Sequence, residues 1–172
     1  MAGAGKVTTR CTISQMPNWL YLVFSFVYAA GLALWIGGTV VLGAMVAPSL
    51  FRELERAEAG RIFGGILRRF ARIRLVALGF VIAAAACRAA LWEFNGANAG
   101  SPWIAIRWFF LLIMAVSIIF ELFVVESAIE KARAAAVAAG TPPGEQFQRL
   151  HRRAEQNLKL ATLAACGALF LN

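Results

Sequence analysis

The longest apolar stretch of the chain runs from Asn18 to Phe51, and no charged side chain occurs between Trp19 and Ala47. About 20 helical residues cross the hydrocarbon core of a bilayer, so this stretch is long enough to span it. Hydrocarbon offers no hydrogen-bond partners, and a single segment satisfies its own backbone N–H and C=O groups only as a helix. The pattern therefore predicts a transmembrane helix over about residues 18–47, which Pro48 ends or kinks.

Three further apolar runs predict helices that cross the membrane at about residues 75–91, 103–125 and 157–171. The last run follows a polar stretch and is short for a complete crossing of the membrane. Residues 1–17 form a polar leader, and turn residues fill the connector at 92–102. We therefore expect an all-α polytopic membrane protein, with one four-helix transmembrane bundle over residues 18–172.

The two longer loops, 49–74 and 126–156, contain most of the charged residues. In the first loop, apolar residues recur at helical spacing among arginines, which is typical of an amphipathic helix on a membrane surface. The second loop reads as a cytoplasmic helix followed by a turn at Thr141–Gly144. We expect lipid headgroups to contact the basic residues of the first loop, namely Arg61, Arg68, Arg69, Arg72 and Arg74.

Small residues recur along the first predicted span. Ala30, Ala33, Gly37, Val40 and Ala44 lie three or four residues apart on one face, and Gly31 and Gly38 lie on a neighbouring strip. Small side chains let helices in lipid approach closely, so this pattern indicates helix packing, although a Gly/Ala-rich span without a special role is the alternative. The predicted packing positions are Gly31, Gly37, Gly38, Ala44 and Pro48.

The composition supports a membrane protein, because 60% of the residues are hydrophobic and only 15% are charged. In a soluble protein the net charge of +8 would indicate nucleic acid, but here the basic residues flank apolar spans, where they set topology and attract anionic lipid. Lysine and arginine gather in the two long loops. The positive-inside rule then places these loops in the cytoplasm and both termini outside, as in a bacterial cytoplasmic membrane.

Ionisable residues within the predicted spans are candidates for function because they are costly in lipid. Arg88 and Arg107 lie near the outer interface, where long side chains can snorkel to water. Glu121 and Lys159 lie near the inner interface, on the third and fourth spans. The alternatives for Glu121 are an ion pair with Lys159 across these helices, a cation-binding site, and a lipid-facing or protonated carboxyl group.

Residues for common enzyme chemistry are scarce. The sequence has no aspartate and one histidine, His151, which rules out a Ser-His-Asp triad and an HExxH zinc motif. Soft sulfur ligands suit Cu(I), and Cys87, Met114 and Cys166 fall at middle depths on three spans, although such sulfurs are ordinarily core filler. We therefore expect a non-enzymatic protein, and no cofactor is indicated.

The run from Leu34 to Phe70 resembles the opening of the transmembrane protein 205-like family, a membrane domain of uncharacterised function. The matching features are Trp35 with its glycines, then Pro48 with Leu50-Phe51, then Ala59-Gly60 and Gly64. A second block, around Phe147, Leu150-His151 and Asn157, also resembles it. The resemblance covers most of residues 20–165 and implies a four-helix membrane domain. A vertebrate relative's association with platinum-drug tolerance implies metal or small-solute handling.

Two functions are compatible with these patterns. The first is an accessory subunit, which docks in a larger membrane assembly through small-residue faces and the amphipathic loop. The alternative is transport of, or tolerance to, a metal ion or small solute, for which a homo-oligomer would enclose the path. The expected partners are the lipid bilayer and other membrane chains or further copies of this chain, and not nucleic acid.

Overall fold

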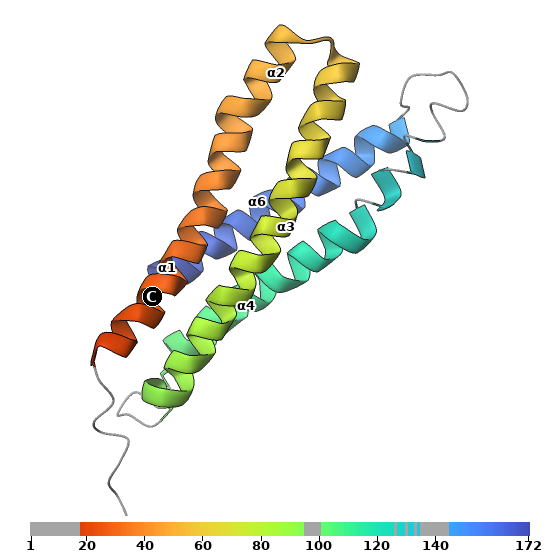
Figure 1. Ribbon diagram of the computed structural model, residues 1–172. Coiled ribbons are helices and arrows are strands. Elements are labelled where there is room, and N and C mark those ends of the chain that lie inside the picture. Colours follow the sequence, from red (N-terminus) through yellow and green to blue (C-terminus); the bar gives the residue numbers. More distant parts are fainter. Residues whose placement is uncertain (1–17, 95–100, 126, 130, 133, 135–144) are drawn as a thin grey trace, which may run out of the picture.

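A computed structural model describes residues 18–94, 101–125, 127–129, 131–132, 134 and 145–172, and these residues contain helices and no strands (Figure 1). The predicted leader and the predicted turn at Thr141–Gly144 therefore lie outside the described residues. In chain order the elements are α1 (Asn18–Val41), η2 (Leu42–Val46), α2 (Ala47–Glu53), α3 (Arg56–Arg88), η3 (Ala89–Glu93), α4 (Pro102–Phe120), η4 (Glu121–Val125) and α6 (Glu145–Phe170). The prediction of an all-helical fold is confirmed for this part of the chain.

The first helix does not end at Pro48, because a π-helical turn lets it continue to Glu53. Proline lacks an N–H group, and its ring clashes with the carbonyl group four residues earlier. In η2 the backbone turn is wider, and the Ala47 N–H group donates to the carbonyl oxygen of Leu42, five residues back. This wider turn accommodates the proline without a break. The elements α1, η2 and α2 therefore form one long rod (Figure 1).

The predicted surface helix at 49–74 and the predicted span at 75–91 are not separate elements. Both belong largely to α3, which continues from Arg56 to Arg88 because no proline interrupts it and its glycines remain helical. Only Leu54 and Glu55 separate α2 from α3, so the two rods run antiparallel as a hairpin (Figure 1). The Leu54 N–H group donates to the Leu50 carbonyl at 3.0 Å, which closes the end of α2.

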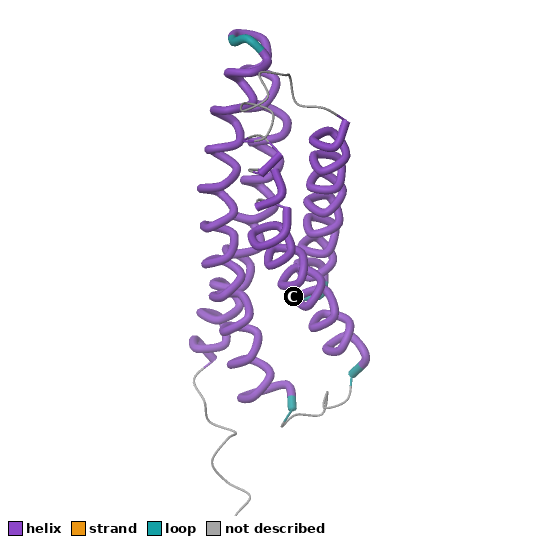
Figure 2. Tube along the Cα trace, turned by 90° about the vertical axis from the view of Figure 1, so that its right-hand side faces the viewer, coloured by secondary structure: helices purple, strands orange, loops and turns teal. Residues whose placement is uncertain are grey.

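The core lies where four long helices meet, below the tip of the hairpin. Helix α1 packs on α3, α4 packs on α6, and α6 also contacts α1. Figure 2 shows the long helices lying side by side. Helix α6 contributes mainly alanines, which allow close approach of its neighbours. The larger buried side chains are Tyr28, Leu32 and Trp35 from α1, Leu78 and Val81 from α3, and Leu111, Met114 and Ile118 from α4.

Two of the predicted packing positions lie in the contact between α1 and α3. A Cβ atom on Gly31 would lie 2.4 Å from Val81 Cγ2, and one on Gly38 would lie 2.4 Å from the Phe70 ring. By contrast, Gly37 has open space around it, and Ala44 and Pro48 are exposed. The seven-residue strip of Gly31 and Gly38 therefore serves packing within the chain, whereas Gly37, Ala44 and Pro48 face away from α3.

We predict that Gly31→Ala lowers the free energy of unfolding by about 1–3 kcal/mol, because the new methyl group overlaps Val81 and approaches the Ala77 carbonyl oxygen. Gly37→Ala is the matched control, since its methyl group enters open space and alanine favours helix. Thermal unfolding in detergent measures both variants. Equal stability of the two variants would contradict the packing described for Gly31.

Three helical segments are long and apolar enough to cross a membrane: Trp19–Glu53, Glu58–Glu93 and Pro102–Ile129. Helix α6 is not among them, because its first half is strongly polar. The predicted fourth span at 157–171 is therefore part of a longer helix, and the structure does not establish it as a complete crossing. Three spanning segments are sufficient to indicate an integral membrane protein.

Candidate functional site

Three arginines are buried between the helices. The relative exposure is 0% for Arg74, 3% for Arg88 and 4% for Arg107. Arginine stays protonated in proteins, so each of these side chains brings a full positive charge into the bundle. Buried charges are costly unless they are paired, and their partners define two clusters at different heights.

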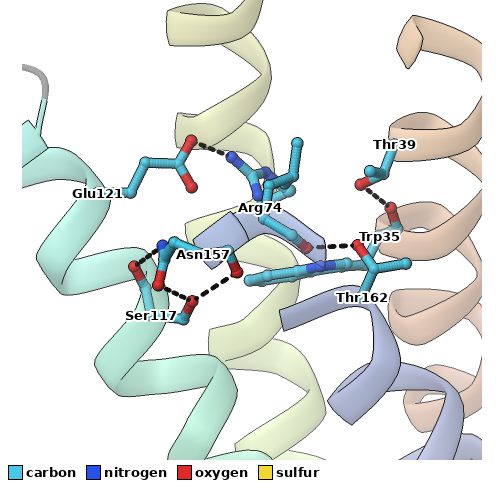
Figure 3. Close-up of polar contacts among 8 residues, drawn as sticks. Trp35, Thr39, Arg74, Ser117, Glu121, Asn157 and Thr162 are labelled. Carbon is cyan, nitrogen blue, oxygen red and sulfur yellow. Dashed lines mark hydrogen bonds and ion pairs between the residues drawn. The ribbon is translucent and has the colours of Figure 1, made fainter. Parts of the chain in front are cut away.

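The Arg74 cluster consists of Arg74, Glu121, Trp35 and Phe70. The Arg74 guanidinium forms an ion pair with the Glu121 carboxylate, from α3 to η4 (Figure 3). It also lies 5.1 Å from the centre of the Trp35 ring and 5.2 Å from the centre of the Phe70 ring, within the range of cation–π attraction. Arg74 Nε and Nη1 have no hydrogen-bond partner among the described residues, so the rings and one carboxylate supply its contacts there.

Beside this cluster, Ser117 of α4 and Asn157 of α6 hydrogen-bond to each other in both directions (Figure 3). Ser117 Oγ donates to Asn157 Oδ1 at 2.7 Å, and Asn157 Nδ2 donates to the Ser117 carbonyl at 3.0 Å. A polar pair of this kind fixes the register of two helices in an apolar surrounding. It joins α6 to α4 at the height of the ion pair.

The Glu93 cluster consists of Glu93, Arg88, Arg107, Tyr21 and Asn172. Glu93 forms ion pairs with both arginines, one of them with Arg88 at 3.5 Å. Arg88 also donates to the Tyr21 hydroxyl at 3.2 Å and to the Asn172 side-chain oxygen. These contacts connect α1, α3, η3, α4 and the end of the chain after α6. One carboxylate thus serves two buried guanidinium groups.

Both half-buried glutamates, Glu93 and Glu121, lie in π-helical turns. Glu93 ends η3, where the Phe94 N–H group donates to the Ala89 carbonyl five residues back, and Glu121 begins η4. A π turn inserts an extra residue and rotates the side chains that follow, and such turns are frequent at functional sites. In this chain they place the two carboxylates next to arginines of neighbouring helices.

The structure corrects several predicted roles. Glu121 pairs with Arg74 and not with Lys159, which is 70% exposed and pairs with Glu155 on its own helix at 2.7 Å. Arg74 does not contact headgroups, because its side chain is fully buried. Arg88 and Arg107 do not snorkel to water, since both side chains are buried and paired with Glu93. The side chains of Arg61, Arg68, Arg69 and Arg72 are exposed, and their contact with lipid stays a prediction.

The three candidate sulfur ligands differ in burial. Cys87 is half-buried on α3, Met114 is fully buried in the core, and Cys166 is exposed on α6. In the described part of the chain, no group of three or more histidine, cysteine or acidic side chains is arranged to hold a metal ion. The side chain of His151 lies outside the description.

Burial of Arg74 and Arg88 was a readable signal that the sequence analysis missed. Both arginines share a helical face with buried apolar residues of α3, at steps of three and four along the list Ala71, Arg74, Leu78, Val81, Ala85, Arg88. The row is recognisable when one helix continues through residue 74. It was overlooked because an element boundary was predicted at residues 74–75. The partner of each arginine is not readable from spacing, because it depends on how the helices pack.

The fold and its buried ion pairs define the class of this protein: an α-helical integral membrane protein whose spans are joined by charged contacts. Residues 30–138 match the sequence profile of a domain of unknown function, DUF4149, and the chain belongs to this family. No curated protein and no solved structure matches the chain. The family description gives no function, and the resemblance to the transmembrane protein 205-like family stays a prediction.

Proposed function

We propose that this protein is a non-enzymatic accessory subunit of a larger membrane assembly, and that it docks through the outer face of its first helix. The observation that carries the proposal is the small-residue strip, defined as Ala33, Gly37, Val40 and Ala44. All four residues are exposed, and nothing lies within 4 Å of a Cβ atom built on Gly37. The strip is therefore unused by the chain's own bundle and suits close approach by a helix of another membrane chain.

The hairpin arm, defined as residues 41–70, supports the same proposal. The rods that form it are 35 and 36 residues long. At 1.5 Å per residue each rod is roughly 50 Å long, while the hydrocarbon core is only about 30 Å thick. The arm therefore extends beyond the hydrocarbon. Among its described side chains only Ala59 is buried, and Val41, Met45 and Phe51 are exposed apolar residues available to a partner.

The charge on the arm supports a cytoplasmic orientation. The arm contains Arg52, Arg56, Arg61, Arg68 and Arg69 against three glutamates. Arg61 and Arg69 border an open groove of about 230 Å³, lined also by Ile62, Gly65 and Ile66. A groove with guanidinium groups at its rim and an apolar floor suits anionic headgroups at the cytoplasmic surface of a bacterial membrane. The arm then reaches its partner from the cytoplasmic side.

The test is native mass spectrometry of the tagged protein after gentle extraction from the membranes that make it. We expect the wild-type chain in fixed ratio with other membrane chains. Gly37→Leu inserts a large side chain into the small-residue strip and is expected to weaken this association about tenfold or more, as overpacking does in a close contact. Gly79→Leu is the matched control, because Gly79 is equally open but lies on α3.

A wild-type chain that emerges only alone or as a homo-oligomer would contradict the subunit proposal. Equal retention of partners by Gly37→Leu and Gly79→Leu would contradict the proposed docking face. Comparison of circular-dichroism spectra of the two variants separates loss of docking from loss of fold.

Small-solute transport or tolerance is the second candidate function, and the buried charges of the Glu93 cluster favour it. With two arginines and one carboxylate, this cluster attracts an anionic solute more than a metal cation. Membership in the transmembrane protein 205-like family, implied by the residues around Pro48, would support the same candidate. A homo-oligomer in the native mass spectrum would favour it over the subunit.

A further inference from the structure

Counted over its side chains, the Glu93 cluster has two positive charges and one negative charge. Arg88 and Arg107 are both more than nine-tenths buried, and both pair with the single carboxylate of Glu93. The other hydrogen-bond partners of Arg88 are the Tyr21 hydroxyl and the Asn172 amide oxygen, which are neutral. The Arg88 guanidinium also lies 5.0 Å from the centre of the Tyr21 ring and 5.7 Å from that of the Tyr28 ring. Among the described residues no second carboxylate pairs with either arginine.

Apart from Glu93, acidic side chains are absent from long segments of the sequence. The sequence contains no aspartate, and no glutamate occurs within residues 1–52, 94–120 or 156–172. These ranges include residues 1–17 and the connector at 95–100. Within residues 1–172 the acidic side chains other than Glu93 lie on the hairpin arm or in residues 121–155.

Unused hydrogen-bond donors accompany the excess charge. Arg88 Nε and Arg107 Nε are buried and have no hydrogen-bond partner in the described part of the chain. Arginine cannot lose its proton to relieve the cost, and its planar fork of N–H groups matches the oxygens of a carboxylate or a phosphate. A bound oxyanion would satisfy the charge and the donors together.

We propose that the Glu93 cluster binds one oxyanion, a phosphate or carboxylate group, at Arg88 and Arg107. The cluster borders the surface at Asn172, which is exposed and accepts a hydrogen bond from Arg88. Two sources offer the same chemistry at this end of the spans: the phosphate of a lipid headgroup, and a free anion from the adjoining aqueous phase. The site does not depend on the accessory role proposed above.

The test replaces Asn172 with aspartate, which places a carboxylate beside Arg88 and neutralises the cluster without removing a buried group. Gln156→Glu is the matched control, because it adds the same charge at an exposed position in the first half of α6, away from Asn172. The full-length proteins are delipidated in a neutral detergent, and the rise in their melting temperature is titrated with inorganic phosphate. In parallel, native mass spectra record phosphatidylglycerol retained from vesicles of phosphatidylglycerol and phosphatidylcholine.

We expect the wild-type protein and Gln156→Glu to respond equally, either to inorganic phosphate or by retaining phosphatidylglycerol. Asn172→Asp is expected to bind the anion about tenfold or more weakly, because the new carboxylate contacts Arg88 in place of the bound anion. A response to phosphate identifies a free anion as a ligand, and retention of the lipid without that response identifies a headgroup. Absence of both responses in the wild-type protein, or equal binding by Asn172→Asp, would overturn the proposal.

Discussion

Replacement of Glu121 with alanine is expected to lower the free energy of unfolding by about 3–5 kcal/mol. The substitution leaves the Arg74 guanidinium fully buried without its carboxylate, and Arg74 cannot become neutral. Its ring contacts with Trp35 and Phe70 remain, but cation–π attraction contributes only about 0.5–2 kcal/mol. The loss should appear as a lower melting temperature and a lower denaturant midpoint in detergent.

Two further variants make this prediction specific. Arg74→Met combined with Glu121→Ala removes both charges and is expected to recover most of the lost stability, because no unpaired charge remains. Lys159→Ala, which removes the other candidate partner of Glu121, is expected to cost less than about 1 kcal/mol, because its pair with Glu155 is exposed. A larger loss with Lys159→Ala than with Glu121→Ala would contradict the assigned pairing.

Replacement of Glu93 with glutamine is expected to be at least as damaging, at about 3–5 kcal/mol or more. This single change leaves Arg88 and Arg107 close together with no carboxylate between them. The two guanidinium groups then repel each other in a surrounding of low dielectric constant, in addition to losing their partner. Unfolding in detergent, without added phosphate, measures the loss.

A second variant distinguishes the effect of charge from a general loss of packing. Arg107→Met removes the excess charge and leaves one arginine with one carboxylate, so it is expected to cost less than Glu93→Gln even though it removes a larger side chain. If Arg107→Met proves the more destabilising variant, the cluster is limited by lost contacts of Arg107 and not by excess positive charge.

The sequence allowed prediction of the helical membrane fold but not of its element boundaries. Apolar run length alone identified the spans near Trp19 and Trp103, because lipid imposes helix on any such run. The prediction that the first helix ends at Pro48 was wrong. Proline disrupts a regular α-helix, but the π turn η2 changes the geometry before Pro48 and the helix continues. A π turn depends on how the whole rod packs, so a local residue pattern does not predict it.

The candidate site was predictable in part. Glu121 was singled out correctly as a polar residue of a span, but its partner was assigned by depth, and depth does not decide between Arg74 and Lys159. The decision comes from helix rotation, which turns Arg74 inward with Ala71 and Leu78 and leaves Lys159 exposed. Likewise, the small residues at steps of three and four along α1 were recognised, but only packing shows that Gly31 and Gly38 face α3 while Gly37 faces outward.

The measurement that tests the docking role most directly is photo-cross-linking in intact membranes, with a diazirine amino acid at Ala33 and, in a separate variant, at Gly79. Both positions are exposed, but only Ala33 belongs to the small-residue strip. We expect a cross-link from Ala33 to a single different membrane chain, which Gly37→Leu abolishes, and only lipid adducts from Gly79. Lipid adducts alone from both positions would contradict the role of this face in docking to a larger assembly.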